Sequence, residues 1–339
     1  MKIAIHHRQG SFSERWIKYC EKNAIDFKLV NAFDNNIIEQ LADCDALLWH
    51  HHHAHFKDSI VAKKILFTLE HAGIKVFPDF KTGWHFDDKV AQKYLLEAIN
   101  APLVPSYVFY DKEQALAWAN STDYPKVFKL KGGAGSSNVR LVKNKNEAIK
   151  LINKAFGKGF AQFDRYENLK EKFRKFKSGQ EGLFGVIKGL IRLFIGTKFG
   201  NEQYLERGYI YFQEFIPNNK FDTRVVVING KVAAAERRFV RENDFRASGS
   251  GEFSYEGINI DIIKVAFDVA KKLNLQSVAF DFVLDDQQKP LIVEISYGFG
   301  TEGIKIVPGY WDSYLNYFNE EFNAEELILS NLIKEIDIT

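Results

Sequence analysis

Two acidic residues interrupt apolar runs in the last quarter of the sequence. Asp281 lies inside VAFDFVL, Glu294 lies inside LIVEIS, and Ser296 falls on the same strand face as Glu294. A carboxylate in an apolar strand is costly to bury unless a cation or an arginine compensates its charge. Two readings stay open: the oxygens hold a divalent ion, magnesium or alternatively manganese, beside a triphosphate, or the carboxylates form salt bridges with Arg224 and Arg238.

A second group of residues has the chemistry of a phosphate site. The segment GGAGSSN at 132–138 offers backbone N–H groups and hydroxyls that can close over a polyphosphate. Lys129 precedes this segment, Lys89 lies in the FDDK run, and both ammonium groups can neutralise phosphates. An ordinary hairpin turn and two solvated lysines are the alternatives. The candidate loop residues are Gly133, Ala134, Gly135, Ser136 and Ser137.

The run YFQEFI has the character of a nucleotide-binding strand. It is apolar, contains Gln213 and Glu214, and is closed by Pro217. Such a strand at a sheet edge presents main-chain N–H and C=O groups to a purine, while Phe215 and Ile216 cover the face of the base. The alternative is an amphipathic edge strand without a ligand.

Histidine-rich segments follow two predicted strands near the amino terminus. HHRQGSF comes after the first strand and HHHHAHF after the third, and ligands of parallel sheets gather at the carboxyl ends of strands. Arg8 suits an anionic carboxylate, and a histidine can accept the proton of an attacking amine. A polar loop at a domain interface is the alternative, and a transition-metal site is a minor one. The candidate substrate residues are His6, His7, Arg8, His50 and His52.

The elements that position these residues follow from hydrophobic periodicity. Short apolar runs alternate with helix-like segments from Lys2 to Pro78, which predicts a small parallel α/β domain. Around the glycine-rich segment the order is strand, turn, strand, whereas a Rossmann or P-loop motif would continue into a helix. TRVVVING and KVAAAERRF flank an Asn-Gly turn and predict a hairpin. A helix over 261–273 precedes the two acidic strands.

The order of these motifs resembles the ATP-grasp ligases, most closely the RimK-like ligases that add glutamate to a ribosomal protein. The resemblance covers roughly residues 85–305 and rests on Lys89, PKVFKLKGGAGSSNVRLV, QEFI, FDTR, AAAERRFVRENDFRAS, AFDFV and VEISYGFGTEGI. It implies an α/β chain, α+β in the grasp domains, with an ATP-grasp fold behind an N-terminal Rossmann-like pre-ATP-grasp domain. The implied domains are a pre-ATP-grasp domain (1–84), an entry segment (85–125), a small lobe (126–216) with an insertion at 157–208, and a large lobe (217–339).

The same resemblance implies roles for individual residues. The implied ATP-binding residues are Lys89 and Lys129 at the phosphates, Glu214, Phe215 and Ile216 at the adenine, Asp222 at the ribose side and Arg246 at the phosphate end. Asp281 and Glu294 would hold magnesium, while Arg224 and Arg238 would be the catalytic groups that stabilise charge on the transferred phosphoryl group. Ser296 stands where the family usually has asparagine, and a hydroxyl is a poorer metal ligand than an amide carbonyl.

The function implied by the resemblance is ATP-dependent ligation of a carboxylate to an amine through an acyl phosphate. The tail, EISYGFG followed by PGYWD, resembles ATP-grasp proteins of bacterial surface-polysaccharide biosynthesis, which points to an amino acid and a sugar as substrates. Two alternatives stay open: a kinase-like ATP-grasp phosphotransferase, and a nucleotide-binding regulatory protein with weakened catalysis.

Composition adds limits on partners and location. The formal net charge of +2 predicts no nucleic-acid partner, and two cysteines without metal or disulfide spacing fit a reducing cytoplasm. No signal peptide is recognised at the amino terminus. The basic, Phe-rich insertion at 157–208 is predicted to act as a lid, or as a contact in a homo-oligomer. A peripheral membrane contact and then RNA binding are its alternatives.

Overall fold

The computed structural model describes residues 1–132, 138–161, 205–241, 244–247 and 251–337. The loop residues Gly133–Ser137 and most of the insertion at 157–208 therefore lie outside the described residues. The chain forms two compact units: unit 1 comprises Met1–Phe86, Tyr94–Pro102 and Asn218–Thr339, and unit 2 comprises Asp87–Lys93 and Leu103–Pro217. The division into four domains drawn from the sequence stays a prediction.

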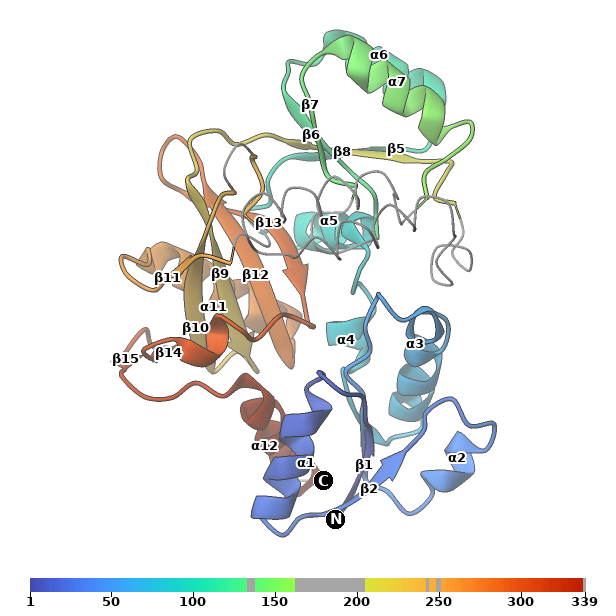
Figure 1. The fold of residues 1–339 in the computed structure, drawn as a ribbon, viewed down its shortest axis with the longest axis vertical. Helices are drawn as coiled ribbons and strands as arrows, with labels where there is room; N and C mark the ends of the chain where they lie inside the picture. Colours follow the sequence, from blue (N-terminus) through green and yellow to red (C-terminus); the bar gives the residue numbers. More distant parts are fainter. Residues whose placement is uncertain (133–137, 162–204, 242–243, 248–250, 338–339) are drawn as a thin grey trace, which may run out of the picture. The chain divides into compact units, whose positions relative to one another are not determined.

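Unit 1 contains the predicted parallel α/β domain, which is confirmed (Figure 1). Its four-stranded sheet has the order β2-β1-β3-β4 and is parallel throughout. The strands are β1 (Lys2–His6), β2 (Asp26–Val30), β3 (Ala46–Leu48) and β4 (Lys75–Phe77). The helices are α1 (Ser13–Lys22), α2 (Ile37–Gln40), α3 (Phe56–His71) and α4 (Phe80–Gly83). The central strands β1 and β3 are buried on both faces, which explains their continuous apolar runs, whereas the edge strand β2 is largely exposed or half-buried.

A seven-stranded antiparallel sheet lies in the rest of unit 1, in the order β13-β12-β9-β10-β14-β15 with β11 paired to β10. The strands are β9 (Phe221–Ile228), β10 (Val232–Phe239), β11 (Phe253–Ser254), β12 (Ser277–Leu284), β13 (Pro290–Ser296), β14 (Tyr310–Asp312) and β15 (Tyr317–Phe318). The helical segments are α11 (Ile260–Leu273), the 3₁₀ turn η1 (Ile304–Ile306) and α12 (Ala324–Asp337). The predicted hairpin is confirmed, because Asn229 and Gly230 join β9 to β10 with φ angles of 52° and 62°.

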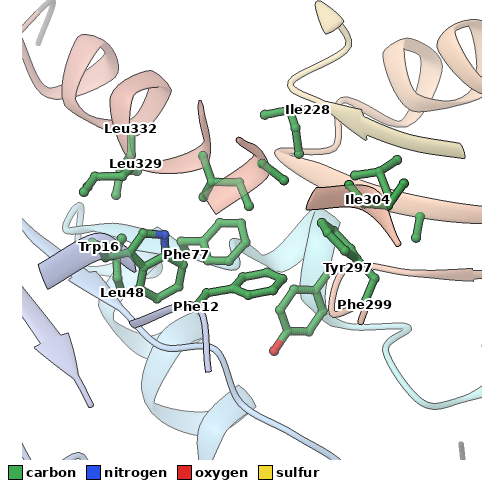
Figure 2. Packing of buried hydrophobic residues seen from close by; sticks show 14 of the residues in the cluster. Phe12, Trp16, Leu48, Phe77, Ile228, Tyr297, Phe299, Ile304, Leu329 and Leu332 are labelled. Atoms are coloured by element: carbon green, nitrogen blue, oxygen red, sulfur yellow. The ribbon is translucent and has the colours of Figure 1, made fainter. Parts of the chain in front are cut away.

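One hydrophobic core joins the two sheets of unit 1 (Figure 2). Ile3 and Ile5 of β1 face this core, whereas Ala4 between them faces a separate core under α3. Figure 2 shows Trp16 and Phe77 beside Leu329 and Leu332 of α12, and Phe12 and Ile228 of β9 belong to the same cluster. The indole N–H of Trp16 also donates a hydrogen bond to the carbonyl of Glu325, at 3.0 Å. The first and last segments of the chain therefore share one buried interior.

Unit 2 holds a four-stranded antiparallel sheet of order β5-β8-β6-β7 with two helices against it (Figure 1). The strands are β5 (Ser106–Phe109), β6 (Lys126–Lys129), β7 (Arg140–Val142) and β8 (Ile210–Glu214), and the helices are α6 (Lys112–Ser121) and α7 (Lys145–Ala155). Helix α5 (Lys89–Ala98) begins in unit 2 and ends in unit 1. The predicted strands on either side of the glycine-rich loop are confirmed as the antiparallel pair β6 and β7.

Among the described helices, none is both long enough and apolar enough to cross a lipid bilayer.

Candidate active site

Six charged residues of the seven-stranded sheet lie on one face, at one end of the strands: Asp222, Arg224, Glu236, Arg238, Asp281 and Glu294. Cross-strand neighbours share a face in an antiparallel sheet, and the register pairs Asp281 with both Arg224 and Glu294, and Asp222 with Arg238. Further along the same face, Val226, Ile228, Ala234 and Ala279 enter the apolar core of unit 1. Each strand therefore anchors one end in the core while its other end carries charge.

Asp281 is the centre of this charged face. Its Oδ1 accepts a hydrogen bond from Nε of Arg224 at 2.8 Å, and its Oδ2 accepts from Nη2 of Arg224 at 3.0 Å. Nη2 of Arg238 also lies 2.8 Å from Oδ2. Arg238 is shared, because it donates to both oxygens of Asp222 at 2.7 and 2.6 Å. The salt-bridge reading of the sequence is thus confirmed for Asp281.

The two aspartates respond differently to this arrangement. Burial alone would raise the pKa of Asp281, but the guanidinium groups of Arg224 and Arg238 outweigh burial and hold the pKa well below its ordinary value. Burial raises the pKa of Asp222, and repulsion from Asp281 adds to this effect, so that the attraction of Arg238 and Arg224 does not outweigh it. Asp281 is therefore the carboxylate that keeps a full negative charge for a cation.

The predicted metal ligands have suitable chemistry for a hard cation. Asp281 and Glu294 stand opposite each other in register, and Ser296 stands opposite Ala279, the next position on the same face. Carboxylate and hydroxyl oxygens suit magnesium, which commonly keeps few protein ligands and completes its shell with water and phosphate. In the described part of the chain, no group of three or more His, Cys, Asp or Glu residues is arranged to hold a metal ion. The Ser296 hydroxyl donates to the Gly298 carbonyl at 2.5 Å.

Glu236 is a charged-face residue that the sequence reading did not select. It lies opposite Arg224 in the β9–β10 register and is only 2% exposed. Burial raises its pKa to about 7, despite the nearby cations of Arg224 and Arg238. In the sequence, Glu236 begins the run ERR, which resembles a group of charged side chains exposed to solvent. The available signal was the period-two pattern, which places Glu236 and Arg238 on the face of the buried Ala234.

In unit 2, the two predicted phosphate-binding lysines are both buried. Lys129, at the end of β6, is 6% exposed and donates from Nζ to Oε1 of Gln213 at 2.6 Å. Lys89, also 6% exposed, donates its backbone N–H to the carbonyl of Lys131 at 2.9 Å. The solvated-lysine alternative is wrong for both side chains. Lys131 immediately precedes the GGAGSSN segment, so both predicted lysines are located near the base of that loop.

The predicted adenine-binding run lies on β8, but β8 is not an edge strand. It pairs with β5 on one side and with β6 on the other. The main-chain N–H and C=O groups of β8, as far as Glu214, therefore serve in these strand pairs. Glu214 accepts hydrogen bonds from Nζ of Lys126 at 2.8 Å and from the hydroxyl of Tyr107 at 2.9 Å. Phe215 and Ile216 follow where the strand has ended. The adenine role of Glu214–Ile216 stays a prediction.

The predicted phosphate-end residue, Arg246, lies in the loop after β10. Its guanidinium pairs with Asp244, with Nη2 to Oδ2 at 2.7 Å and Nε to Oδ2 at 2.9 Å. Burial alone would raise the pKa of Asp244, but Arg246 outweighs burial and lowers it. The phosphate role of Arg246 and the ribose role of Asp222 stay predictions.

Two of the predicted substrate residues meet at the carboxyl ends of β1 and β3. Arg8 donates from Nη2 to the carbonyl of His50 at 3.2 Å. Nδ1 of His50 accepts from the backbone N–H of Phe12 at 3.2 Å, and the two rings stack at 3.7 Å. A Cβ at Gly298 would lie 3.1 Å from Nε2 of His50. Since Gly298 lies two residues after Ser296, this histidine reaches the loop that leaves the charged face.

The other predicted histidines have different surroundings. His7 is near this point, because its Nδ1 lies 3.0 Å from Oγ of Ser13. His52 donates its backbone N–H to Asp58 at 2.8 Å. His6 instead points into the α3 side of the domain, where its Nδ1 accepts from the backbone of Ala32 at 3.0 Å and its ring packs between aromatic side chains. We therefore regard His6 as a core residue.

The buried histidines carry no charge near neutral pH. Burial is the main cause that lowers the pKa of His50 well below its ordinary value and the pKa of His52 to about 4. Repulsion from Arg8 is the second cause for both residues. Burial likewise lowers the pKa of His51 to about 3. Arg8 is therefore the cation among these groups at neutral pH, and an anion near them would be attracted by Arg8.

We expect the free energy of unfolding to fall as the pH is lowered from 7 to 5. Histidines gain protons near pH 6.5 in the unfolded chain, whereas His51 and His52 stay neutral in the folded protein down to about 3 and about 4. Each extra proton bound by the unfolded chain contributes a slope of about 1.4 kcal/mol per pH unit. Urea denaturation at several pH values measures this slope.

His51→Phe provides the matched comparison, because its ring fills similar space and cannot titrate. In the variant, the free energy of unfolding should depend less steeply on pH, and the slope should fall by up to the contribution of one proton. Glu236 has the opposite effect on the pH dependence of stability, since its raised pKa favours the folded state at low pH. Because Glu236 is present in both proteins, its effect cancels in the comparison. Identical slopes in the two proteins would contradict the neutral, buried state of His51.

Comparisons with known proteins agree with this geometry. The family model of the RimK-like ATP-grasp domain matches residues 201–309, and that of the ATP-binding domain of carbamoyl-phosphate synthase L chain matches residues 88–178. A probable alpha-L-glutamate ligase of Aeromonas salmonicida is 32% identical over 103 residues, which are 30% of this chain and 34% of that protein. The match thus spans about a third of the relative's length.

Solved structures share the fold over nearly the whole chain. A RimK domain protein ATP-grasp from Sphaerobacter thermophilus has a TM-score of 0.53 at 16% identity and covers 87% of this chain and 90% of its own. D-alanine–D-alanine ligase from Bacillus anthracis, complexed with ATP, has a TM-score of 0.58 at 13% identity. The match covers 100% of this chain and 98% of that chain. The resemblance inferred from the motifs is confirmed. The chain therefore has the ATP-grasp fold, and its residues 201–309 match the model of the RimK-like ATP-grasp domain.

Proposed function

We propose that this protein is an ATP-dependent ligase that joins a carboxylate to an amine. The observation that carries the proposal is the charged face of β9, β10, β12 and β13, where Arg224 and Arg238 converge on Asp281 and Glu294 stands opposite Asp281 in register. This charged face lies within the match to the RimK-like domain, and the Aeromonas relative and the Bacillus anthracis protein are ligases by name.

The proposed reaction has two steps. A carboxylate oxygen of the substrate attacks the γ-phosphorus of ATP, the bond from that phosphorus to ADP breaks, and an acyl phosphate forms. The amine then attacks the acyl carbon, inorganic phosphate leaves, and the amine loses a proton. Arg224 and Arg238 would stabilise the negative charge that moves from the phosphoryl oxygens to the leaving phosphate. Lys89 and Lys129 would bind the phosphates of ATP.

Asp281, Glu294 and Ser296 are the residues that would hold magnesium, with manganese as a substitute. The ion would offset charge on the triphosphate. Asp281 contributes the carboxylate with the lowered pKa, so it stays ionised at any physiological pH.

The carboxylate substrate would bind near Arg8, whose guanidinium lies beside neutral, buried histidines. His7, His50 and His52 would contribute polar atoms around it. The name of the Aeromonas relative makes L-glutamate the first amine to test. The resemblance of the tail to polysaccharide-associated proteins makes amino sugars and uronic acids the next candidates, in a cytoplasmic, soluble reaction.

The test is a screen of carboxylate and amine pairs for ADP release, with the mass of the product measured. We expect ADP release that requires both substrates, and a product mass equal to their sum minus water. ADP release with a phosphorylated, hydroxyl-bearing product would identify a kinase instead. Binding of ATP without turnover on any pair, in the presence of magnesium and manganese, would favour a regulatory nucleotide-binding protein.

A further inference from the structure

Glu236 has an unusual position for a carboxylate. It is 2% exposed, and its Oε2 has no hydrogen-bond partner among the described residues. A Cβ at Gly303 would overlap this oxygen, so the absence of a side chain at Gly303 is what leaves space for the carboxylate. A buried, unsatisfied carboxylate is destabilising by itself. A group that binds this oxygen in another state of the site would offset that cost.

Arg224 lies between two carboxylates and pairs with one of them. The register places Glu236 on one side of Arg224 and Asp281 on the other, all on the same face. Arg224 donates both Nε and Nη2 to Asp281, which also receives Nη2 of Arg238. Glu236 is thus a second carboxylate within one strand spacing of the Arg224 backbone, with an oxygen free to accept.

A cation at Asp281 would disturb this pairing. Both oxygens of Asp281 are engaged by guanidinium groups, whereas a metal ion needs at least one oxygen directed at it and repels the nearby positive charges. Arg238 has a second partner in Asp222, so it can lose the Asp281 contact and stay paired. Arg224 needs a new partner.

We propose that Glu236 is a positioning residue that receives Arg224 when a divalent cation binds Asp281. This proposal rests on the magnesium site of the proposed function. In the absence of the cation Arg224 neutralises Asp281, and in its presence Arg224 stays on the charged face instead of moving into solvent. Arg224 is then held beside the reacting phosphoryl group when the metal arrives.

The electrostatics of Glu236 are consistent with such an exchange. Burial raises its pKa, and the groups facing it are the cations Arg224 and Arg238 and the anions Asp222 and Asp281. Near neutral pH, the carboxyl is therefore partly protonated while Arg224 is bound elsewhere. A closer guanidinium would favour the ionised form, which pairs more strongly.

The experiment measures binding and does not require the substrates. Calorimetry with Mg·ADP, and with ADP in EDTA, gives the contribution of the metal to affinity for each protein, and ADP has no γ-phosphate that would attract Arg224. Glu236→Gln, which keeps size and shape, should weaken Mg·ADP about tenfold and leave ADP in EDTA unchanged. Glu236→Leu should behave in the same way if the glutamine variant folds poorly. Glu256→Gln, an exposed residue of the same unit, controls for the lost charge.

The combination with Arg224→Gln decides whether Glu236 acts through that arginine. In the Arg224→Gln background, Glu236→Gln should have no further effect on Mg·ADP affinity. Unchanged Mg·ADP binding in Glu236→Gln, or an equal loss in both backgrounds, would overturn the proposal. If the wild-type protein binds Mg·ADP no more tightly than ADP in EDTA, the magnesium site of the proposed function fails instead.

Discussion

Replacement of Asp281 by asparagine is expected to reduce ATP turnover by about a thousandfold, the effect of removing a charged group from a phosphoryl-transfer site. The amide keeps the shape of the side chain but loses the charge that would hold magnesium. It also removes the partner of Arg224, while Arg238 keeps its contacts with Asp222. Steady-state ADP release at saturating ATP, measured over a range of magnesium concentrations, is the direct test.

Two further variants show whether this loss is specific to the site. Glu294→Gln should cause a similar loss, because Glu294 is the cross-strand neighbour of Asp281. Asp286→Asn, an exposed carboxylate in the turn between the same two strands, should retain wild-type turnover. Circular dichroism should show the same folded structure in all three proteins. Wild-type turnover in both Asp281→Asn and Glu294→Gln would contradict the metal assignment.

Replacement of Lys129 by alanine is expected to weaken ATP binding by about 1 to 3 kcal/mol, the range of a lost charge-assisted hydrogen bond. Lys129 is buried at the end of β6, three residues before the glycine-rich loop, so its ammonium group is well placed for a phosphate. Calorimetric titration with ATP measures the change.

Adenosine separates a phosphate contact from a general defect in the nucleotide site. If Lys129 binds phosphate, Lys129→Ala should leave adenosine affinity unchanged while ATP affinity falls. Lys143→Ala, an exposed lysine after β7, is the matched control and should bind ATP normally. Equal losses of ATP and adenosine affinity would mean that Lys129 supports the structure of unit 2 and does not contact a phosphate.

The strands of the candidate site could be predicted from sequence because their patterns are local. SVAFDFVL and PLIVEIS are the strands β12 and β13 residue for residue, since apolar runs of this length between turn residues leave few alternatives. The Asn229–Gly230 hairpin was equally clear, because few other dipeptides adopt positive φ at both turn positions.

The partners of those strands depended on contacts that a local pattern does not contain. YFQEFI looked like an edge strand, but β8 lies between β5 and β6, and β5 is about a hundred residues earlier in the chain. His6 looked like a ligand-binding residue, but its position at the end of β1 turns it toward Trp49. Glu236 was missed because a charge run looks solvated until the register with Arg224 is known.

Asp281 shows how two sequence readings can both apply. From the sequence, salt bridges to Arg224 and Arg238 are the alternative to a metal, and the structure contains these salt bridges. The same arginines lower the pKa of Asp281 and keep it ionised, which is also what a metal ligand requires. An ion pair at this position therefore does not argue against a role in cation binding.

The shared core of unit 1 has a consequence for the order in which the protein can be made. Trp16 and Phe77 complete their packing only against Leu329 and Leu332 of α12, so the amino-terminal sheet leaves the ribosome long before its partner helix exists. At the usual rates of synthesis this delay is on the order of ten to fifty seconds. Unit 2, most of which is one continuous stretch, can close its sheet during that time. The nascent amino-terminal segment must therefore remain incompletely packed, with apolar surface available to chaperones, until translation reaches the last helix.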